Sequence, residues 1–206
     1  MGSRATLAAV AADVPKIKVP KRKPQPIPTE SFEKLLAKAP TAEWKAVLLC
    51  GWWAGLRLSE ATNLQWDRSE VLPWLDLESR RIVLPAQFAK SGEDQWVPIH
   101  STLYSALTAL PRGDGAAVFN FRSRRGGGRL TRNGATNVIR DLAKKAGVRL
   151  CMHKLRKGFG CRMAQALGKG GAAVLHEMMR HSSMQVTMDY YANVDDAKAK
   201  AIDSLT

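Results

Sequence analysis

A tyrosine near the end of the chain is a candidate nucleophile toward phosphorus. Tyr190 lies in TMDYYANV, nine residues after His181, which follows an expected helix end in RHSSM. A tyrosine hydroxyl can attack a phosphate if nearby cations lower its pKa and stabilise the charge that develops on the phosphate. Adjacent helical residues point about 100° apart, so we expect the neighbouring Tyr191 to be a structural residue. Without further context, a core position would explain either tyrosine.

The cations that this chemistry needs occur in two short segments. Arg57, in AGLRLSEA, lies between two expected helices, where its planar guanidinium could point at a phosphate, and Glu60 could hold it in place. His153 and Arg156, in HKLR, are spaced so that both side chains share one helix face and can reach one small anion. Taken singly, a surface ion pair and an ordinary solvated helix start explain the same residues.

A flexible cation is expected at the tip of a hairpin. Lys90 begins the KSGED segment between two β-prone stretches. A lysine there can enter a DNA groove and, if its pKa falls, donate a proton to a leaving oxygen. The alternative is an exposed lysine that blunts a sheet edge.

Metal and nucleotide sites are not supported. Cys151, His153, His176 and His181 are near one another in sequence, but their spacing fits no zinc motif, and His176 and His181 share no helix face. The glycine-rich RRGGGR lacks the lysine-threonine ending and the preceding strand of a phosphate loop. We therefore expect no metal and no other cofactor.

The overall charge indicates a polyanionic partner. The net charge is +14 over 206 residues, which makes nucleic acid the first candidate and an anionic membrane surface the second. A basic amphipathic anchor helix is hard to find, and no apolar run reaches the ~18 residues of a membrane span. The three cysteines are odd in number and scattered, which is typical of reduced thiols in a cytoplasm.

The apolar periodicity predicts a mainly α fold with a small antiparallel β-sheet (α+β). Two β-prone segments, 80–88 and 95–99, are expected to form the hairpin that carries Lys90. Helices are expected over 29–37, 42–55, 59–64, 101–110, 131–146, 153–167, 171–180 and 184–192. We divide the chain into three parts: residues 1–28, a start that looks vector-derived followed by a basic Pro/Lys linker; a globular domain over 29–194; and a tail helix over 195–206.

The order and spacing of these segments resemble the tyrosine site-specific recombinase (phage integrase) family over residues 29–194. The matching segments are AGLRLSE (54–60), FAKSGEDQWVPI (88–99), HKLR (153–156), RHSS (180–183) and TMDYY (187–191). The resemblance implies the fold of a recombinase catalytic domain. It also implies six catalytic residues, namely Arg57, Lys90, His153, Arg156, His181 and Tyr190, with Glu60 in support.

The resemblance implies site-specific recombination of double-stranded DNA through a 3′-phosphotyrosyl intermediate, without metal or ATP. It further implies self-assembly into a synaptic tetramer on DNA, although the isolated chain could be monomeric. The chain departs from the family at Met179-Arg180, where Leu-Gly is usual, so that an arginine adds charge near the phosphate and changes the helix end. An N-terminal DNA-clamping domain is also missing, so we expect a catalytic half acting in a bacterial or phage-encoded cytoplasmic setting.

Three alternatives share parts of this pattern. A type IB topoisomerase uses the same chemistry, but LSEATNLQW and HSSMQVT are more typical of recombinases. A catalytically idle DNA-binding module could keep the fold, although the full residue set argues against it. An RNA-binding protein would be expected to carry aromatic stacking motifs, which the sequence lacks.

Overall fold

The computed structural model describes residues 24–25, 27–89, 92–123 and 127–191. Its centre is α3 (Ala42–Trp53), which packs against α7 (Met152–Leu167) and α5 (Ser101–Thr108). The Thr41 hydroxyl accepts a hydrogen bond from the Trp44 amide and so begins α3. Apolar residues surround α3 almost completely, and most of its side chains are buried.

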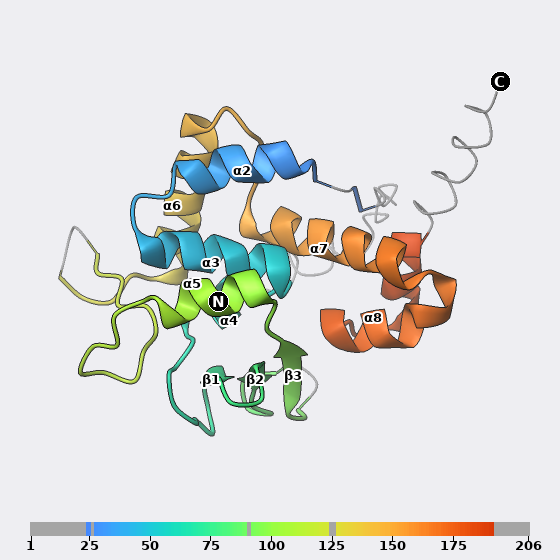
Figure 1. Ribbon diagram of the computed structural model, residues 1–206, viewed down its shortest axis with the longest axis horizontal. Helices are drawn as coiled ribbons and strands as arrows, with labels where there is room; N and C mark the ends of the chain where they lie inside the picture. The colour runs from blue at the N-terminus through green and yellow to red at the C-terminus, as the bar shows by residue number, and fades with distance from the viewer. Residues whose placement is uncertain (1–23, 26, 90–91, 124–126, 192–206) are drawn as a thin grey trace, which may run out of the picture.

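The remaining helices surround this centre (Figure 1). They are α2 (Thr29–Ala37), α4 (Leu58–Thr62), α6 (Arg132–Lys145), the short η1 (Lys169–Gly171) and α8 (Ala172–Met179). Residues 184–191 are also helical. Four of the predicted starts shift by one residue: α4 begins at Leu58, α6 at Arg132, α7 at Met152 and α8 at Ala172. Helix α5 begins at Ser101 as predicted, and its N-cap residue is His100, whose Nδ1 accepts from the Thr102 amide. None of the helices in the described segments is long and apolar enough to span a membrane.

The small sheet has three antiparallel strands in the order β1-β2-β3. They are β1 (Trp74–Asp76), β2 (Arg81–Leu84) and β3 (Gln95–Pro98), and Figure 1 shows them at one side of the helices. The expected hairpin is β2 with β3, where Ile82 pairs with Val97 and both side chains are buried. The mainly α fold with a small antiparallel sheet is thus confirmed, with β1 as an additional strand. Lys90 at the hairpin tip, the linker before residue 24 and the tail over 195–206 lie outside the described residues.

Buried side chains form two clusters that meet along α7. The larger one fills the space around α3 and includes Met152 and Leu155 from the first half of α7. The smaller one joins Phe159 and Cys161, from the second half of α7, to α8 and to Tyr190 and Tyr191. Helix α7 therefore connects the arginine-bearing part of the molecule to the tyrosine-bearing part.

Candidate active site

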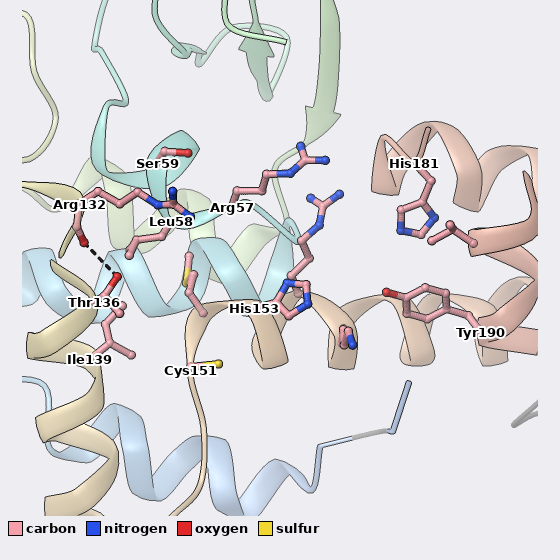
Figure 2. Close-up of a pocket in the computed structure, with 14 residues that line it drawn as sticks. Arg57, Leu58, Ser59, Arg132, Thr136, Ile139, Cys151, His153, His181 and Tyr190 are labelled. Atoms are coloured by element: carbon pink, nitrogen blue, oxygen red, sulfur yellow. Dashed lines mark hydrogen bonds between the residues drawn. The ribbon is translucent and has the colours of Figure 1, made fainter. Parts of the chain in front are cut away.

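Five of the six predicted catalytic residues line one pocket of about 460 Å³. They are Arg57, His153, Arg156, His181 and Tyr190, and they come from the α3–α4 junction, the start of α7, the turn after α8 and the last described helix. In Figure 2 the Arg57, His153, His181 and Tyr190 side chains point toward a common space. The fold thus brings together residues that are up to 133 positions apart in sequence, from Arg57 to Tyr190.

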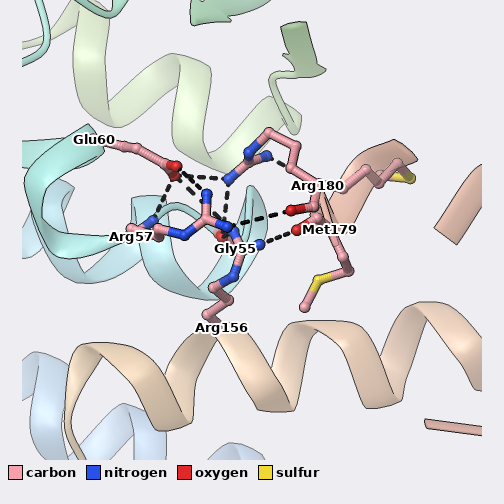
Figure 3. A network of polar contacts seen from close by, with 7 residues as sticks. Gly55, Arg57, Glu60, Arg156, Met179 and Arg180 are labelled. Atoms are coloured by element: carbon pink, nitrogen blue, oxygen red, sulfur yellow. Dashed lines mark hydrogen bonds and ion pairs between the residues drawn. The ribbon is translucent and has the colours of Figure 1, made fainter. Parts of the chain in front are cut away.

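Three arginines gather around one carboxylate beside this pocket (Figure 3). Glu60 Oε1 lies 2.5 Å from Arg57 Nη1, and Glu60 Oε2 lies 2.7 Å from Arg180 Nη2 and 4.0 Å from Arg156 Nη1. The Glu60 side chain is 6% exposed, and Arg156 and Arg180 are similarly buried. Glu60 also accepts from the Arg57 backbone amide at 2.7 Å, so it caps α4 while holding the cations.

Backbone carbonyls fix the direction of the guanidiniums. Arg156 donates to the Gly55 and Met179 carbonyls, and Arg57 Nη2 donates to the Arg180 carbonyl at 3.2 Å. Met179 and Arg180 end α8, where carbonyls without helical partners carry partial negative charge. Each guanidinium has five N–H donors, so these bonds leave donors on Arg57 and Arg156 for a ligand in the pocket.

The cluster holds more positive charge than its carboxylate can balance. Burial alone would raise the pKa of Glu60, but the charges of Arg180, Arg156 and Arg57 outweigh it and keep the pKa below its ordinary value. Burial, followed by the charges of Arg180 and Arg57, lowers the pKa of Arg156 to about 9. Three guanidiniums and one carboxylate leave two uncompensated positive charges, and a bound anion would relieve their repulsion.

Arg180 lies behind the pocket rather than in it. It ends α8 with φ 50° and ψ 50°, a left-handed conformation that glycine adopts more readily. Its side chain is 2% exposed and bonds Glu60, and Nη1 donates to the Met178 carbonyl at 2.9 Å. The expected change at the helix end is therefore a strained turn tied to α4. The added charge is buried beside Glu60, not presented to the pocket.

The start of α7 forms another wall of the pocket. Cys151, Met152 and His153 line it there, so the positive end of a 16-residue helix faces the same space as the arginines. Partial burial, then the charges of Lys157, Arg156 and Arg57, lowers the pKa of His153. A neutral imidazole at this position can accept a proton at pH 7.

Tyr190 and Tyr191 differ in what they face. The Tyr190 ring lines the pocket and stacks on the His181 ring, with centroids 5.4 Å apart and planes 22° apart. Burial raises the pKa of Tyr190 to about 12, against the lowering effect of Arg156. Tyr191 is 1% exposed and, like Tyr190, belongs to the smaller core cluster, but it does not line the pocket. Gly160 permits this packing because a Cβ there would meet a Tyr190 ring carbon at 2.5 Å.

A buried hydroxyl lies within hydrogen-bond distance of the His181 ring. His181 Nδ1 lies 2.9 Å from Thr187 Oγ1, which also lies 3.1 Å from His176 Nδ1. His176 and His181 share no helix face, as expected, but the turn at Arg180 brings both rings to Thr187. Burial, then Arg156 and His176, lowers the pKa of His181 to about 4.

The lowered pKa of His181 predicts loss of stability in acid. The unfolded chain binds a proton on this imidazole below about pH 6.5, whereas the folded chain resists it down to about pH 4. The contribution is therefore fully present above pH 6.5 and is lost as the pH falls toward 4, by on the order of 2 kcal/mol once solvent screening of this partly exposed ring is allowed for. Urea unfolding at pH 7.5 and pH 4.5 measures it. The drop should be smaller in His181→Asn, and an equal drop in both proteins would contradict the assignment.

Sequence reasoning missed several residues of the pocket. Arg132, Thr136 and Lys157 also line it, and Arg132 is the first residue of α6 after the Thr131 cap. A basic residue in the first turn of the predicted 131–146 helix was the sequence signal available for Arg132. Within the described segments, His, Cys, Asp and Glu side chains form no group of three or more that could hold a metal ion.

Comparison with known proteins assigns this chain to a family. The phage integrase family profile matches residues 26–198. The tyrosine recombinase XerA of Pyrococcus furiosus is 25% identical over 179 residues, covering 84% of this chain and 59% of the relative. This chain therefore spans less than two thirds of that protein's length.

Two solved structures share the fold. The catalytic domain of bacteriophage HP1 integrase matches with a TM-score of 0.56 and 22% identity, over 81% of this chain and 86% of that one. The Tn1549 transposon integrase, in complex with a circular intermediate DNA, matches with a TM-score of 0.64 and 20% identity, over 91% of this chain and 68% of that one. With the family match over most of its length, the chain belongs to the phage integrase family of tyrosine recombinases.

Proposed function

We propose that this chain is the catalytic domain of a site-specific recombinase that cuts and rejoins DNA through a covalent bond from Tyr190 to a 3′-phosphate. The observation that carries the proposal is the single pocket that places the Tyr190 ring beside two arginines whose charge is not balanced by Glu60. The relatives support this proposal, since XerA is a tyrosine recombinase and the Tn1549 integrase was solved in complex with DNA.

In this proposal the arginines bind the scissile phosphate. Arg57 and Arg156 donate to its non-bridging oxygens, where charge-assisted bonds are strong. These bonds strengthen as the phosphorus becomes pentacoordinate and its oxygens more negative, which is the condition for lowering the barrier. Glu60 and the carbonyls at the end of α8 keep both guanidiniums aimed at the pocket, so little reorganisation is needed when DNA arrives.

The bond changes balance without a cofactor. The Tyr190 oxygen bonds to phosphorus, the bond from phosphorus to the 5′-oxygen breaks, and one phosphodiester replaces another. Because the Tyr190 hydroxyl is protonated at neutral pH, its proton must leave during attack, and His153 is the neutral base at the pocket wall. Lys90 supplies a proton to the departing 5′-oxygen, and His181 donates a hydrogen bond to the phosphate. Attack by another 5′-hydroxyl reverses these steps.

We propose double-stranded DNA as the partner and assembly of four copies on two DNA sites as the working state. The net charge of +14 supports a polyanionic partner. The three cysteines, all in the described part of the chain, form no disulfide with one another, which supports a reducing compartment. The division into linker, catalytic domain and tail over 1–28, 29–194 and 195–206 remains part of the proposal.

The direct test is covalent adduct formation in the absence of divalent metal. Supercoiled plasmid and a nicked duplex carrying candidate target sites are incubated with the protein in EDTA, and SDS-resistant protein–DNA adducts and plasmid relaxation are scored. We expect adducts linked through a 3′-phosphate, and exchange of strands between paired target duplexes. Relaxation without exchange would favour topoisomerase chemistry. Salt-sensitive DNA binding without any adduct, on every duplex tested, would favour an idle DNA-binding module.

A further inference from the structure

The hydroxyl of Thr187 joins two histidines, only one of which lines the pocket. Thr187 is fully buried, His176 on α8 is half-buried, and neither of these two is among the pocket residues. The Thr187 oxygen lies 2.9 Å from His181 Nδ1 and 3.1 Å from His176 Nδ1. The two imidazole rings meet edge to face, with centroids 6.5 Å apart. All three groups therefore form one hydrogen-bonded chain.

The number of protons available allows only two arrangements of these hydrogen bonds. A threonine hydroxyl carries one proton, and among the described residues Thr187 Oγ1 has no other acceptor within reach, so it donates to one of the two nitrogens and accepts from the other. Either His176 donates and His181 accepts, or the reverse. Each arrangement fixes the tautomer of a neutral His181, because the nitrogen that does not bear the proton is the acceptor.

The environment of His181 favours the first arrangement once an anion is present. Its Nδ1 is occupied by Thr187, so Nε2 is the nitrogen left for the pocket. In the reverse arrangement Nε2 would turn a lone pair toward the phosphate, which repels it. With a pKa of about 4, His181 carries a single ring proton at neutral pH, so the tautomer decides whether it can donate at all. His176 is half-buried and can hold its proton on Nδ1 without such a conflict.

We propose that Thr187 and His176 are positioning residues that hold the His181 proton on Nε2. His176 Nδ1–H donates to Thr187 Oγ1, the Thr187 hydroxyl donates to His181 Nδ1, and His181 Nε2–H is left to donate to the scissile phosphate beside Tyr190. Neither Thr187 nor His176 touches the reacting atoms. The inference rests on the proposed function for what Nε2–H contacts, but the tautomer itself is a property of the free protein.

The test reads the tautomer and the cleavage rate in three variants of the full chain. Thr187→Val removes the hydroxyl with little change of shape, Thr187→Ser keeps it, and His176→Phe removes the outer donor. Long-range ¹H–¹⁵N spectra of the four histidines report which nitrogen carries the proton. We expect the Nε2–H form of His181 in wild type and Thr187→Ser, and a mixture of tautomers in Thr187→Val. The single-turnover rate of adduct formation should fall about tenfold in Thr187→Val, less in His176→Phe, and little in Thr187→Ser.

The outcomes separate this inference from the proposed function. An unchanged Nε2–H form of His181 in Thr187→Val would overturn it, whether or not wild type forms adducts. Equal loss of rate in Thr187→Ser and Thr187→Val would also overturn it, because packing of the methyl group would then explain the effect. If wild type forms no adduct while the spectra change as expected, the positioning holds and the proposed chemistry fails.

Discussion

Tyr190→Phe is expected to abolish covalent adducts with DNA while leaving DNA affinity close to that of wild type. The change removes only the oxygen that would bond to phosphorus and keeps the ring that stacks on His181. DNA affinity should persist because it depends on many lysines and arginines, whose binding releases counterions from the phosphates. Adducts are scored on denaturing gels after incubation with a nicked duplex, and affinity is measured by titration at several salt concentrations.

Tyr191→Phe is the matched control for this prediction. Its hydroxyl is buried, and no described residue forms a hydrogen bond with it, so removing it should leave stability unchanged or raise it slightly. Adduct formation should stay near the wild-type rate, because Tyr191 packs in the core and does not line the pocket. A dead Tyr191→Phe beside an active Tyr190→Phe would reverse the assignment of the nucleophile.

Most elements of the fold could be predicted from the sequence, because helix caps and apolar periodicity favour the same helices and strands that the tertiary contacts stabilise. Helices α3 and α6 begin within one residue of the predicted starts, because the Thr41 and Thr131 hydroxyls each accept from a backbone amide of the first turn. Arg57 and His100 were missed as N-cap positions because an arginine or histidine is not a usual signal for one. Strand β1 was missed because three residues are too few to show an alternating pattern.

The residues of the candidate site could be predicted from the sequence, but the contacts that orient their side chains could not. Arg57, Arg156 and Tyr190 could be found from motif order, whereas the carbonyls that aim the arginines depend on where α8 ends in space. Arg180 illustrates the limit: spacing placed it next to His181, but only the left-handed turn sends its side chain to Glu60, 120 residues away. The same turn brings His176 and His181 to Thr187, a contact that helix periodicity gave no reason to expect.

Arg156→Lys is expected to lower the single-turnover rate of adduct formation by about 10²-fold or more at saturating DNA. Lysine keeps the positive charge but lacks the planar fork, so it cannot donate to the Gly55 and Met179 carbonyls and to a phosphate oxygen at the same time. DNA affinity should change little, because one charge is retained. The lost bonds would lower stability, so urea unfolding must accompany the rate measurement.

Arg162→Lys supplies the control that separates loss of catalysis from loss of stability. Arg162 lies on the same helix, stacks 3.5 Å from the Trp52 ring centroid and donates to the Trp52 carbonyl, but it does not line the pocket. It should therefore lose stability to a similar extent and still form adducts at nearly the wild-type rate. If Arg156→Lys cleaved as fast as Arg162→Lys, the buried guanidinium would be a structural group. Of the two arginines in the proposed mechanism, only Arg57 would then be left to bind the phosphate.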